Sequence, residues 1–441
     1  MEFIFLLLEI IPFIIIIFAF FDLKVSLFLF VIYQILVPDL NIKLLGVVFS
    51  YNFLYSMVLL AFLFKKKDKN VNILKLEELT PFFFLLFFLL LLIPFQWQME
   101  TSIQFNYWRM EFMSTCILPF LIIKVSKYDE DLLNYIKYGL ILAVLVSCLY
   151  AVFLLFMPSG YNPYLMTIAK LFGREYNEWY SADDGRTISR IFSTFNHPLS
   201  WCLFLGFMIF IFFKLRNEIS NFLFYFILLL LFVDILYCGV RSGIVSLLPP
   251  ILYLIVRNRQ FKYLFYVSIV IFILFMFAAN NTDLKDYLYS IIDLSGKHTS
   301  TKGSDLDMRL YQLEGCMDAI RGHEILGNGY RWTTYYMSMF GGHPKAYAFE
   351  SLIFVILCNS GYLGFIIWGM FGILLFRNNR KYLNNKEDIY WMDAMCLFYF
   401  VITIVTGEYN ALKVFSLYYV FLLLHLKRNF SMRSSVPRST N

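Results

Sequence analysis

Long apolar runs separated by short polar gaps dominate the chain, as in Pro81–Trp97 and Phe222–Tyr237. A membrane-spanning helix needs roughly 20 apolar residues, whereas the strands of a spanning barrel show short segments of alternating polarity. The unbroken runs therefore favour helices, and we predict an all-α, polytopic membrane protein with about 12–13 transmembrane helices. The predicted spans are residues 3–21, 24–38, 44–64, 81–97, 108–124, 138–157, 198–213, 219–237, 243–256, 263–279, 350–376, 389–406 and 411–426.

The composition agrees with a membrane protein. The mean hydropathy is +0.67 and charged residues make up 15% of the chain, against about 25% in soluble domains. The first apolar run begins at Phe3 with no basic segment before it and no small-residue cleavage site after it, so we interpret it as a retained span. The basic residues lie between spans, which predicts no nucleic-acid partner. Seven cysteines without a CxxC pair indicate neither a disulfide framework nor a zinc site.

Basic residues recur in alternate gaps between the spans, and this alternation predicts the topology. Cytoplasmic loops carry the excess of Lys and Arg, so the long segments 158–197 and 280–349 are predicted to be extracytoplasmic. The side of the N-terminus stays open because the first two runs are short. The basic gaps are Lys65–Lys69, Lys124–Lys137, Lys214–Arg216, Arg257–Lys262, Arg377–Lys386 and the tail from Lys427. The chain divides into N-terminal spans (1–157), a first loop (158–197), central spans (198–279), a large loop (280–349), C-terminal spans (350–426) and a cytoplasmic tail (427–441).

The large loop contains an amphipathic pattern of its own. Its apolar positions recur at i, i+4, i+7, i+11 and i+14, which makes one stripe on a helix, and Gly327-Asn328-Gly329 ends this helical unit. Such a helix is expected to lie over the mouth of a membrane cavity, while the polar tail 431–441 is expected to be disordered. The stripe consists of Leu306, Leu310, Leu313, Met317 and Ile320.

Four features on the predicted extracytoplasmic side carry candidate chemistry. The first is the motif Arg190–Pro198 (RIFSTFNHP), which ends the first loop. The second is Arg241–Gly243 (RSG), in a short turn between two spans. The third is Arg309, near the edge of the apolar stripe. The fourth is Glu350-Ser351, followed after nine residues by the pattern Gly361-x-x-Gly364.

The arginines indicate an anion at the membrane surface. Arginine presents a planar fork of donors that stays charged and matches phosphate oxygens two at a time. A short turn between spans brings the charge of Arg241 close to the hydrocarbon, which is costly unless an anion meets it. A lipid-linked phosphate or pyrophosphate is the anion that lies at that depth. The alternative is that each arginine only anchors a span at the interface.

Glu350 is a candidate general base, because a carboxylate held between desolvation and nearby positive charge can accept the proton of a hydroxyl. The alternative is a helix-start residue that satisfies backbone donors. Asn196 and His197 can contact substrate or merely begin the next helix, with His197 as its cap. The two glycines of the fourth feature are more typical of close packing between spans than of ligand contact. Asp183-Asp184 has no third ligand at a suitable spacing, so neither a metal nor a cofactor is predicted.

The order of these features resembles the O-antigen polymerase and O-antigen ligase superfamily, which are membrane glycosyltransferases of the GT-C type. The resemblance covers about residues 185–375. The ligases have a His-Asn-x9-Gly-x-x-Gly pattern, and the glycine pair fits here at Gly361 and Gly364. Glu350-Ser351 then stands where the ligases have His-Asn, which resembles the polymerase branch, although His343 is near enough to supply an imidazole.

The resemblance implies an enzyme of the bacterial cytoplasmic (inner) membrane with an extracytoplasmic active face. It implies undecaprenyl-pyrophosphate-linked oligosaccharides as substrates and an inverting, metal-independent transfer, in which an acceptor hydroxyl attacks the anomeric carbon and lipid pyrophosphate leaves. Arg190, Arg241 and Arg309 would neutralise the pyrophosphate, and Glu350 would take the proton. The residues expected to contact substrate are His343, Asn196, His197 and Arg331.

The leading hypothesis is a polymerase of lipid-linked polysaccharide repeat units for O-antigen, capsule or exopolysaccharide. A ligase is the alternative within the superfamily, and a flippase or transporter for lipid-linked glycans is the alternative from another class. Flipping needs cationic residues at mid-membrane depth, whereas ionisable residues such as Glu9 and Asp234 are rare inside the spans. Membrane lipid and a chain-length regulator protein are the further partners expected.

Overall fold

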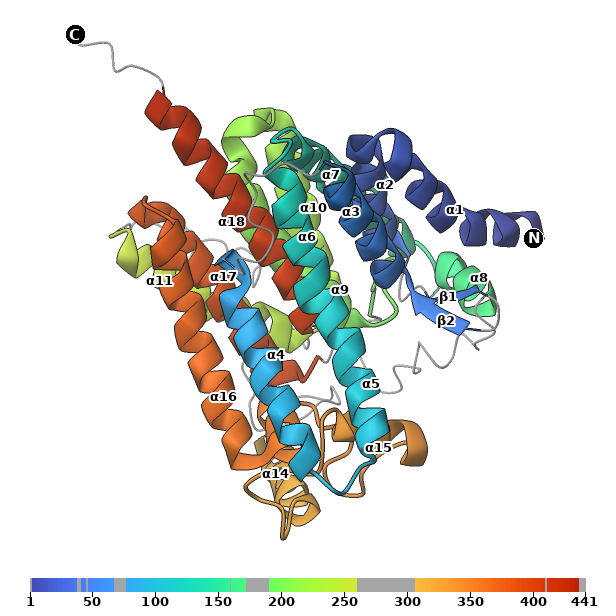
Figure 1. The fold of residues 1–441 in the computed structure, drawn as a ribbon, viewed down its shortest axis with the longest axis vertical. Coiled ribbons are helices and arrows are strands. Elements are labelled where there is room, and N and C mark those ends of the chain that lie inside the picture. The colour runs from blue at the N-terminus through green and yellow to red at the C-terminus, as the bar shows by residue number, and fades with distance from the viewer. Residues whose placement is uncertain are drawn as a thin grey trace, which may run out of the picture.

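The computed structural model describes residues 2–37, 41–44, 47–66, 77–158, 160–171, 190–259, 306–408 and 411–435. These residues are mostly helical, which confirms the predicted all-α class (Figure 1). The helices are α1 (Glu2–Phe21), α2 (Leu23–Leu36), α3 (Tyr51–Lys66), α4 (Thr80–Leu92), α5 (Thr101–Phe112), α6 (Leu118–Ser126), α7 (Leu132–Leu154), α8 (Pro163–Leu171), α9 (Pro198–Leu215), α10 (Asn221–Tyr237), α11 (Arg241–Arg257), α14 (Leu306–Ala319), α15 (Trp332–Phe340), α16 (Leu352–Tyr382), α17 (Lys386–Thr406) and α18 (Ala411–Ser435).

Several of these helices are suited to a membrane. Four of them are long and apolar enough, by length and composition, to cross it, and shorter apolar helices accompany them. The four are Leu132–Leu154, Pro198–Glu218, Leu352–Tyr382 and Lys386–Thr406. The predicted span 263–279 lies outside the described residues, so the total number of spans stays a prediction.

The predicted span 44–64 was wrong at its start. Its first residues belong to a two-stranded antiparallel hairpin, β1 (Asn41–Leu44) and β2 (Val47–Ser50), and the helix begins only at Tyr51. Valine and phenylalanine in this stretch favour the extended chain, which an apolar run alone does not distinguish from a helix.

Two other predicted limits were also wrong. The predicted span 108–124 is part of a longer rod, in which α5 continues through a π-helical turn, Met113–Ile117, into α6. Helix α18 continues to Ser435, so the tail that was predicted to be disordered from residue 431 begins as a helix. Lysine, arginine and leucine before that point are good helix formers and carry the helix past the apolar run.

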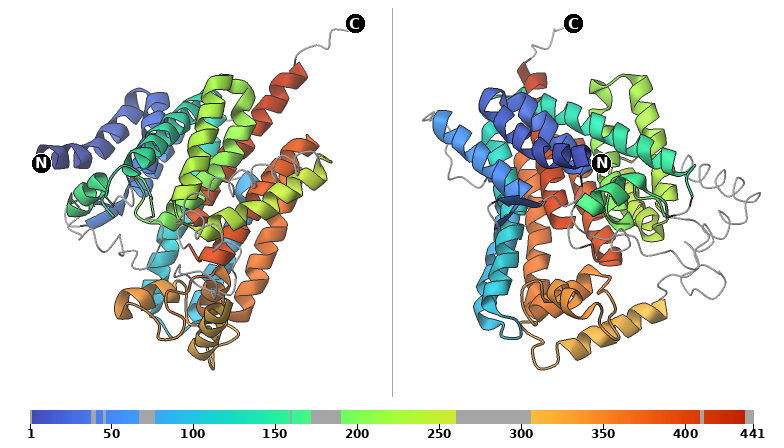
Figure 2. Two further views of the ribbon diagram at one scale, coloured as in Figure 1. Left: turned by 180° about the vertical axis from the view of Figure 1, so that it is seen from behind. Right: turned by 90° about the vertical axis from the view of Figure 1, so that its right-hand side faces the viewer.

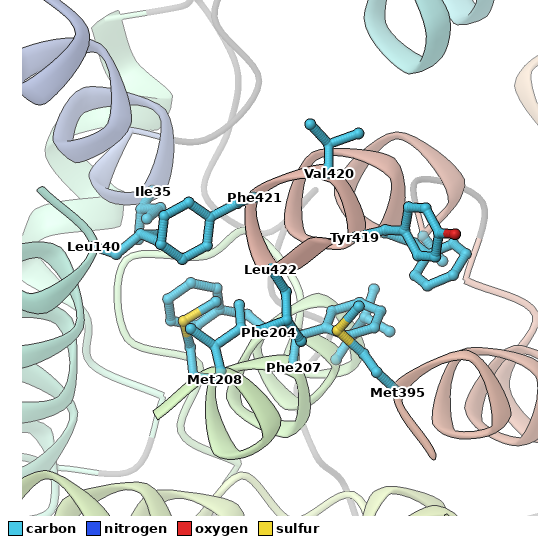
Figure 3. Close-up of a cluster of buried hydrophobic side chains, with 14 of the residues drawn as sticks. Ile35, Leu140, Phe204, Phe207, Met208, Met395, Tyr419, Val420, Phe421 and Leu422 are labelled. Atoms are coloured by element: carbon cyan, nitrogen blue, oxygen red, sulfur yellow. The ribbon is translucent and has the colours of Figure 1, made fainter. Parts of the chain in front are cut away.

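Aromatic side chains fill the space between α9, α17 and α18 (Figure 3). Phe207 meets Phe398 edge to face at 5.4 Å, and Tyr399 stacks on Phe415 at 4.2 Å. At Gly206 a Cβ atom would lie 2.0 Å from the Phe398 ring, so glycine is needed where these helices approach. Such close packing is what holds helices together in lipid, where hydrophobic burial alone adds little.

The bundle has two different ends. One end, here the basic end, carries ion pairs between the helix termini, among them Lys137–Glu218, Lys214–Asp388 and Lys427–Glu78. The α1–α2 turn joins it through Lys24 and Asp129 at 3.0 Å. The opposite end, here the loop end, carries α14, α15 and the start of α16 (Figure 2). Lys137, Lys214 and Lys427, from three of the basic gaps, thus lie at one end.

Candidate functional site

Arg309 lies directly against Glu350 at the loop end. Its Nη2 atom is 3.4 Å from the Glu350 carboxylate, and its Nη1 atom donates to the Glu350 carbonyl oxygen. The guanidinium also donates to the Val405 carbonyl at 3.2 Å and to Gln312 at 3.0 Å. Burial lowers the pKa of Arg309 and the Glu350 carboxylate opposes this, and the group stays charged. One arginine thus joins α14, the start of α16 and the end of α17 at the predicted base.

Ser351, and not Glu350, caps helix α16. The Ser351 Oγ accepts the N–H of Ile353 at 3.2 Å and donates to the Ile404 carbonyl at 2.6 Å. Gly407, with φ of +66°, lies so close that a Cβ atom there would be 2.6 Å from the Ser351 nitrogen. Ser351 therefore has the capping role that was the alternative for Glu350. The Glu350 side chain is 39% exposed and accessible to a reactant.

Helix α16 is broken at Gly361, which has φ +60° and ψ −154°. The segment Glu324–Gly329 fills the break, because Tyr362 N donates to the Glu324 carbonyl at 2.9 Å and Asn328 N donates to the Cys358 carbonyl at 2.8 Å. A Cβ atom at Gly361 would lie 2.5 Å from the Glu324 oxygen. The expected close packing at this glycine is thus against the large loop and not against a neighbouring span.

Gln96, in the turn between α4 and α5, also binds at this break. Gln96 Nε2 donates to the carbonyls of Leu326 and Asn359, at 2.5 and 2.8 Å. The second glycine of the predicted pattern, Gly364, has its Cβ position 2.1 Å from the Ser360 hydroxyl, so a larger residue would displace that side chain. The half-helix that follows Glu350 is therefore held in place by backbone contacts from the large loop.

The amphipathic helix is present as α14, but its apolar stripe does not pack on the protein. Leu310, Leu313 and Met317 are exposed, and Ile320 is the member of the stripe whose side chain is buried in the described part of the chain. The buried side consists of Gln312, Gly315 and Cys316. Small residues allow the loop to approach, since a Cβ atom at Gly315 would lie 2.5 Å from the Lys345 side chain.

His343 lies against the rings of Phe349 and Tyr336, 5.7 and 5.5 Å away. Its Nδ1 accepts the backbone N–H of Ala346 at 3.0 Å, so in the neutral ring the proton is on Nε2. Burial lowers the pKa of His343, and Asp318 partly opposes this. A neutral imidazole whose acceptor nitrogen is already occupied is poorly suited to take a proton.

The first motif folds partly as a helix start. His197 is the N-cap of α9, and its Nδ1 accepts the N–H of Leu199 at 3.1 Å, which is the capping alternative weighed for it. Asn196 precedes this cap and is half-buried. Arg190 lies against the α10–α11 turn, because Ile191 N donates to the Tyr237 carbonyl and a Cβ atom at Gly239 would lie 2.7 Å from Arg190.

Arg241 begins α11, at the loop end of that helix. Helix α11 packs antiparallel to α17, and near their basic ends Tyr253 donates to Asp393 at 2.9 Å. Arg241 precedes Tyr253 by the same number of residues by which Val405 follows Asp393, so both lie at one level of the bundle. The Arg190–Arg241 turn and the Arg309–Glu350 pair thus lie toward the same end of the bundle.

Arg331 forms an ion pair with Glu111 of α5, with Nε 2.9 Å from Oε2. The Tyr330 hydroxyl donates to the same oxygen at 2.6 Å, and burial, followed by the Glu111 charge, raises the pKa of Tyr330. Sequence reasoning did not single out Glu111. An ionisable residue inside a predicted span was the available signal.

A pocket opens beside these groups, between α4, α5, α16 and α17. It encloses about 680 Å³, its open mouth included. Glu111, Arg331 and Asn359 contribute its polar side, and leucines with Trp368 and Tyr399 contribute its apolar side. Gly407 lines the same pocket and also packs against the Glu350 backbone, so the pocket adjoins the Arg309–Glu350 pair.

No group of three potential metal-binding side chains occurs among the residues that the structure describes. Asp183-Asp184 lies outside them. The comparisons with known proteins agree with the resemblance at a coarse level. Residues 225–369 match the family model described as O-antigen ligase, which supports the superfamily but does not distinguish polymerase from ligase. No curated protein and no solved structure matches this chain significantly.

Proposed function

We propose that this protein is a polymerase of lipid-linked polysaccharide repeat units, with its loop end on the extracytoplasmic side of a bacterial cytoplasmic membrane. The reaction is an inverting, metal-independent glycosyl transfer from an undecaprenyl-pyrophosphate-linked chain to an acceptor hydroxyl. Glu350 takes the hydroxyl proton, and the arginines at the loop end compensate the charge that develops on the leaving pyrophosphate.

The observation that carries this proposal is the pairing of Arg309 with Glu350 beside an open pocket. The Arg309 guanidinium contacts both the carboxylate and the backbone carbonyl of Glu350. The position of the carboxylate is therefore defined before substrate binds. Arg309 contacts protein acceptors through both terminal nitrogens, so its first role is to position Glu350. Arg190 and Arg241 are the arginines that we propose to contact the pyrophosphate directly.

The polymerase is favoured over the ligase by the state of the nearby imidazole. A ligase-like mechanism at this position needs a histidine, and His343 uses its Nδ1 lone pair within its own turn. Glu350, in contrast, has an exposed carboxylate. The match to the O-antigen ligase family supports the shared chemistry of both branches.

The test uses the purified protein in nanodiscs with lipid-pyrophosphate-linked repeat units from its own host and EDTA present. We expect a ladder of longer lipid-linked chains and one equivalent of undecaprenyl pyrophosphate for each bond formed. Adding lipid A–core as a second acceptor distinguishes the branches, since transfer to it would identify a ligase. Movement of intact repeat units across vesicle membranes without any new glycosidic bond would contradict both enzyme assignments and favour a flippase.

A further inference from the structure

The pocket beside Glu350 contains polar groups that the proposed reaction does not yet use. Tyr330 and Arg331 both contact Oε2 of Glu111, so Oε1 of that carboxylate is available as an acceptor. Asn359 accepts the Thr333 N–H on its Oδ1 at 2.9 Å, which fixes the amide and directs its Nδ2 hydrogens elsewhere. Within the described residues, the pocket thus presents one acceptor and one donor that lack protein partners.

The rest of the wall is suited to a sugar ring and not to a phosphate. A sugar offers hydroxyls that both donate and accept, together with apolar C–H faces that pack on aromatic rings. Trp368 and Tyr399 supply such rings, and apolar walls with a few placed polar groups are typical of small-ligand pockets. The charged groups in its described lining are the Arg331–Glu111 pair and Glu408, so this lining has no excess of positive charge that would favour a phosphate.

The position of the pocket links it to the reaction centre. Leu352, two residues after Glu350, lines the pocket together with Gly407, which packs against the Glu350 backbone. The pocket therefore adjoins the backbone of Glu350, the residue whose carboxylate is to accept a proton. Glu111 also lies two residues before the π-helical turn Met113–Ile117, and such turns occur frequently at functional sites.

We infer that this pocket is the acceptor-sugar site, with Glu111 Oε1 and Asn359 Nδ2 binding ring hydroxyls and Trp368 packing on the ring face. The inference rests on the proposed function, since it presents the attacking hydroxyl to Glu350. Arg331 is a positioning residue here, because it holds Glu111 in place. Its backbone has a φ of +62°, a strained value for arginine that its surroundings must maintain.

The experiment measures binding of the oligosaccharide alone, released by mild acid from the host's lipid-linked repeat units, to the purified full-length protein. The variants are Asn359→Asp, which keeps an acceptor for Thr333 and replaces the amide donor with a carboxylate oxygen, and Trp368→Phe. Trp97→Phe is the matched control, because Trp97 is 87% exposed at the same end. Each variant must elute as one species with an unchanged melting temperature.

We expect each pocket variant to weaken oligosaccharide binding about tenfold, the effect of one lost hydrogen bond or packed ring, and to raise the KM for acceptor. Arg241→Ala should leave this binding unchanged and lose affinity for undecaprenyl pyrophosphate. Polymerisation with normal KM in both pocket variants would overturn the inference and leave the proposed function intact. Wild-type protein that binds the oligosaccharide through Asn359 but forms no glycosidic bond would keep the sugar site and refute the polymerase. Absence of wild-type binding, with detergent chains occupying the pocket, would overturn the sugar assignment.

Discussion

The two ends of the bundle use charge in opposite ways. At the basic end several cations that tie helices together meet a carboxylate, as Lys137 meets Glu218 at 2.8 Å and Arg380 meets Asp393 at 3.0 Å. At the loop end Arg309 is bonded largely to carbonyl oxygens, and its carboxylate partner is 3.4 Å away and exposed. Saturated pairs fix helices in place, whereas unsaturated groups remain able to bind a reactant. Under the proposed function, the pairs at the basic end hold helices in place and the Arg309–Glu350 pair takes part in the reaction.

We expect the basic end and the loop end to face different compartments. All seven native cysteines are buried, so an introduced exposed cysteine should react selectively. Trp97→Cys at the loop end should be labelled in intact cells by a maleimide that does not cross membranes. Asn384→Cys at the basic end should be labelled only after permeabilisation. The reverse pattern would place the candidate site in the cytoplasm and refute the proposed topology.

The sharpest difference between candidate bases is expected at Glu350. Glu350→Gln keeps the size of the side chain and most of its hydrogen bonding but cannot accept a proton, so turnover should fall by roughly 10²–10⁴-fold. His343→Ala, in the same assay with lipid-pyrophosphate-linked repeat units, should remain within a few-fold of wild type. An active Glu350→Gln beside an inactive His343→Ala would reverse the assignment and favour the ligase branch.

The arginines at the loop end should contribute to the reaction rather than to stability. Arg241→Ala should lower polymerisation by about 3 kcal/mol of transition-state stabilisation, about 10²-fold, with the protein still inserted. Arg309→Ala should have a similar effect, because Glu350 loses its position. Lysine should restore little at either site, since the two-pronged fork is lost. Polymer of normal amount and length from either alanine variant would leave that arginine as an anchor.

Charge at the basic end should affect stability instead. Asp393 is 1% exposed on its side chain and accepts from Arg380, Tyr253 and Asn379, so Asp393→Ala should destabilise the fold by about 3 kcal/mol. Glu387→Ala removes a side chain that is 60% exposed and pairs with Lys214, so it should change stability by at most about 1 kcal/mol. Thermal unfolding in detergent gives both values, and turnover per folded molecule should be normal. A folded Asp393→Ala protein without activity would end the distinction between the two ends.

The smallest effect concerns pH. Burial lowers the pKa of His343, so its unfolded form binds a proton more readily than the folded form. Its contribution to stability is therefore complete above about pH 6.5 and is lost as the pH falls through the lower folded value. Acid melting curves should show a loss that His343→Gln removes. Identical curves for both proteins would mean that protonation of His343 does not change the stability of the fold.

The sequence predicted the class of the fold and part of the site. Apolar runs identified most helices, and the basic gaps anticipated the end at which Lys214 and Lys427 gather. Arg309 and Glu350 were both named, but nothing in the sequence shows that residues this far apart would touch. Glu111 was missed for the same reason, since its partner Arg331 lies 220 residues away. The apolar stripe was correctly assigned to a helix, α14, but periodicity finds an apolar side and does not say whether that side packs on the protein.

The contacts of Gln96 constrain the order of events during biosynthesis. Its amide binds a carbonyl 263 residues further along the chain, at Asn359. At about 5–20 residues per second, a ribosome needs roughly 13–50 s to deliver that partner. Through this interval the α4–α5 hairpin exists without the segment that completes it. The N-terminal helices are therefore made before the segment that binds Gln96 exists, and a nascent chain that stops before residue 359 lacks this contact.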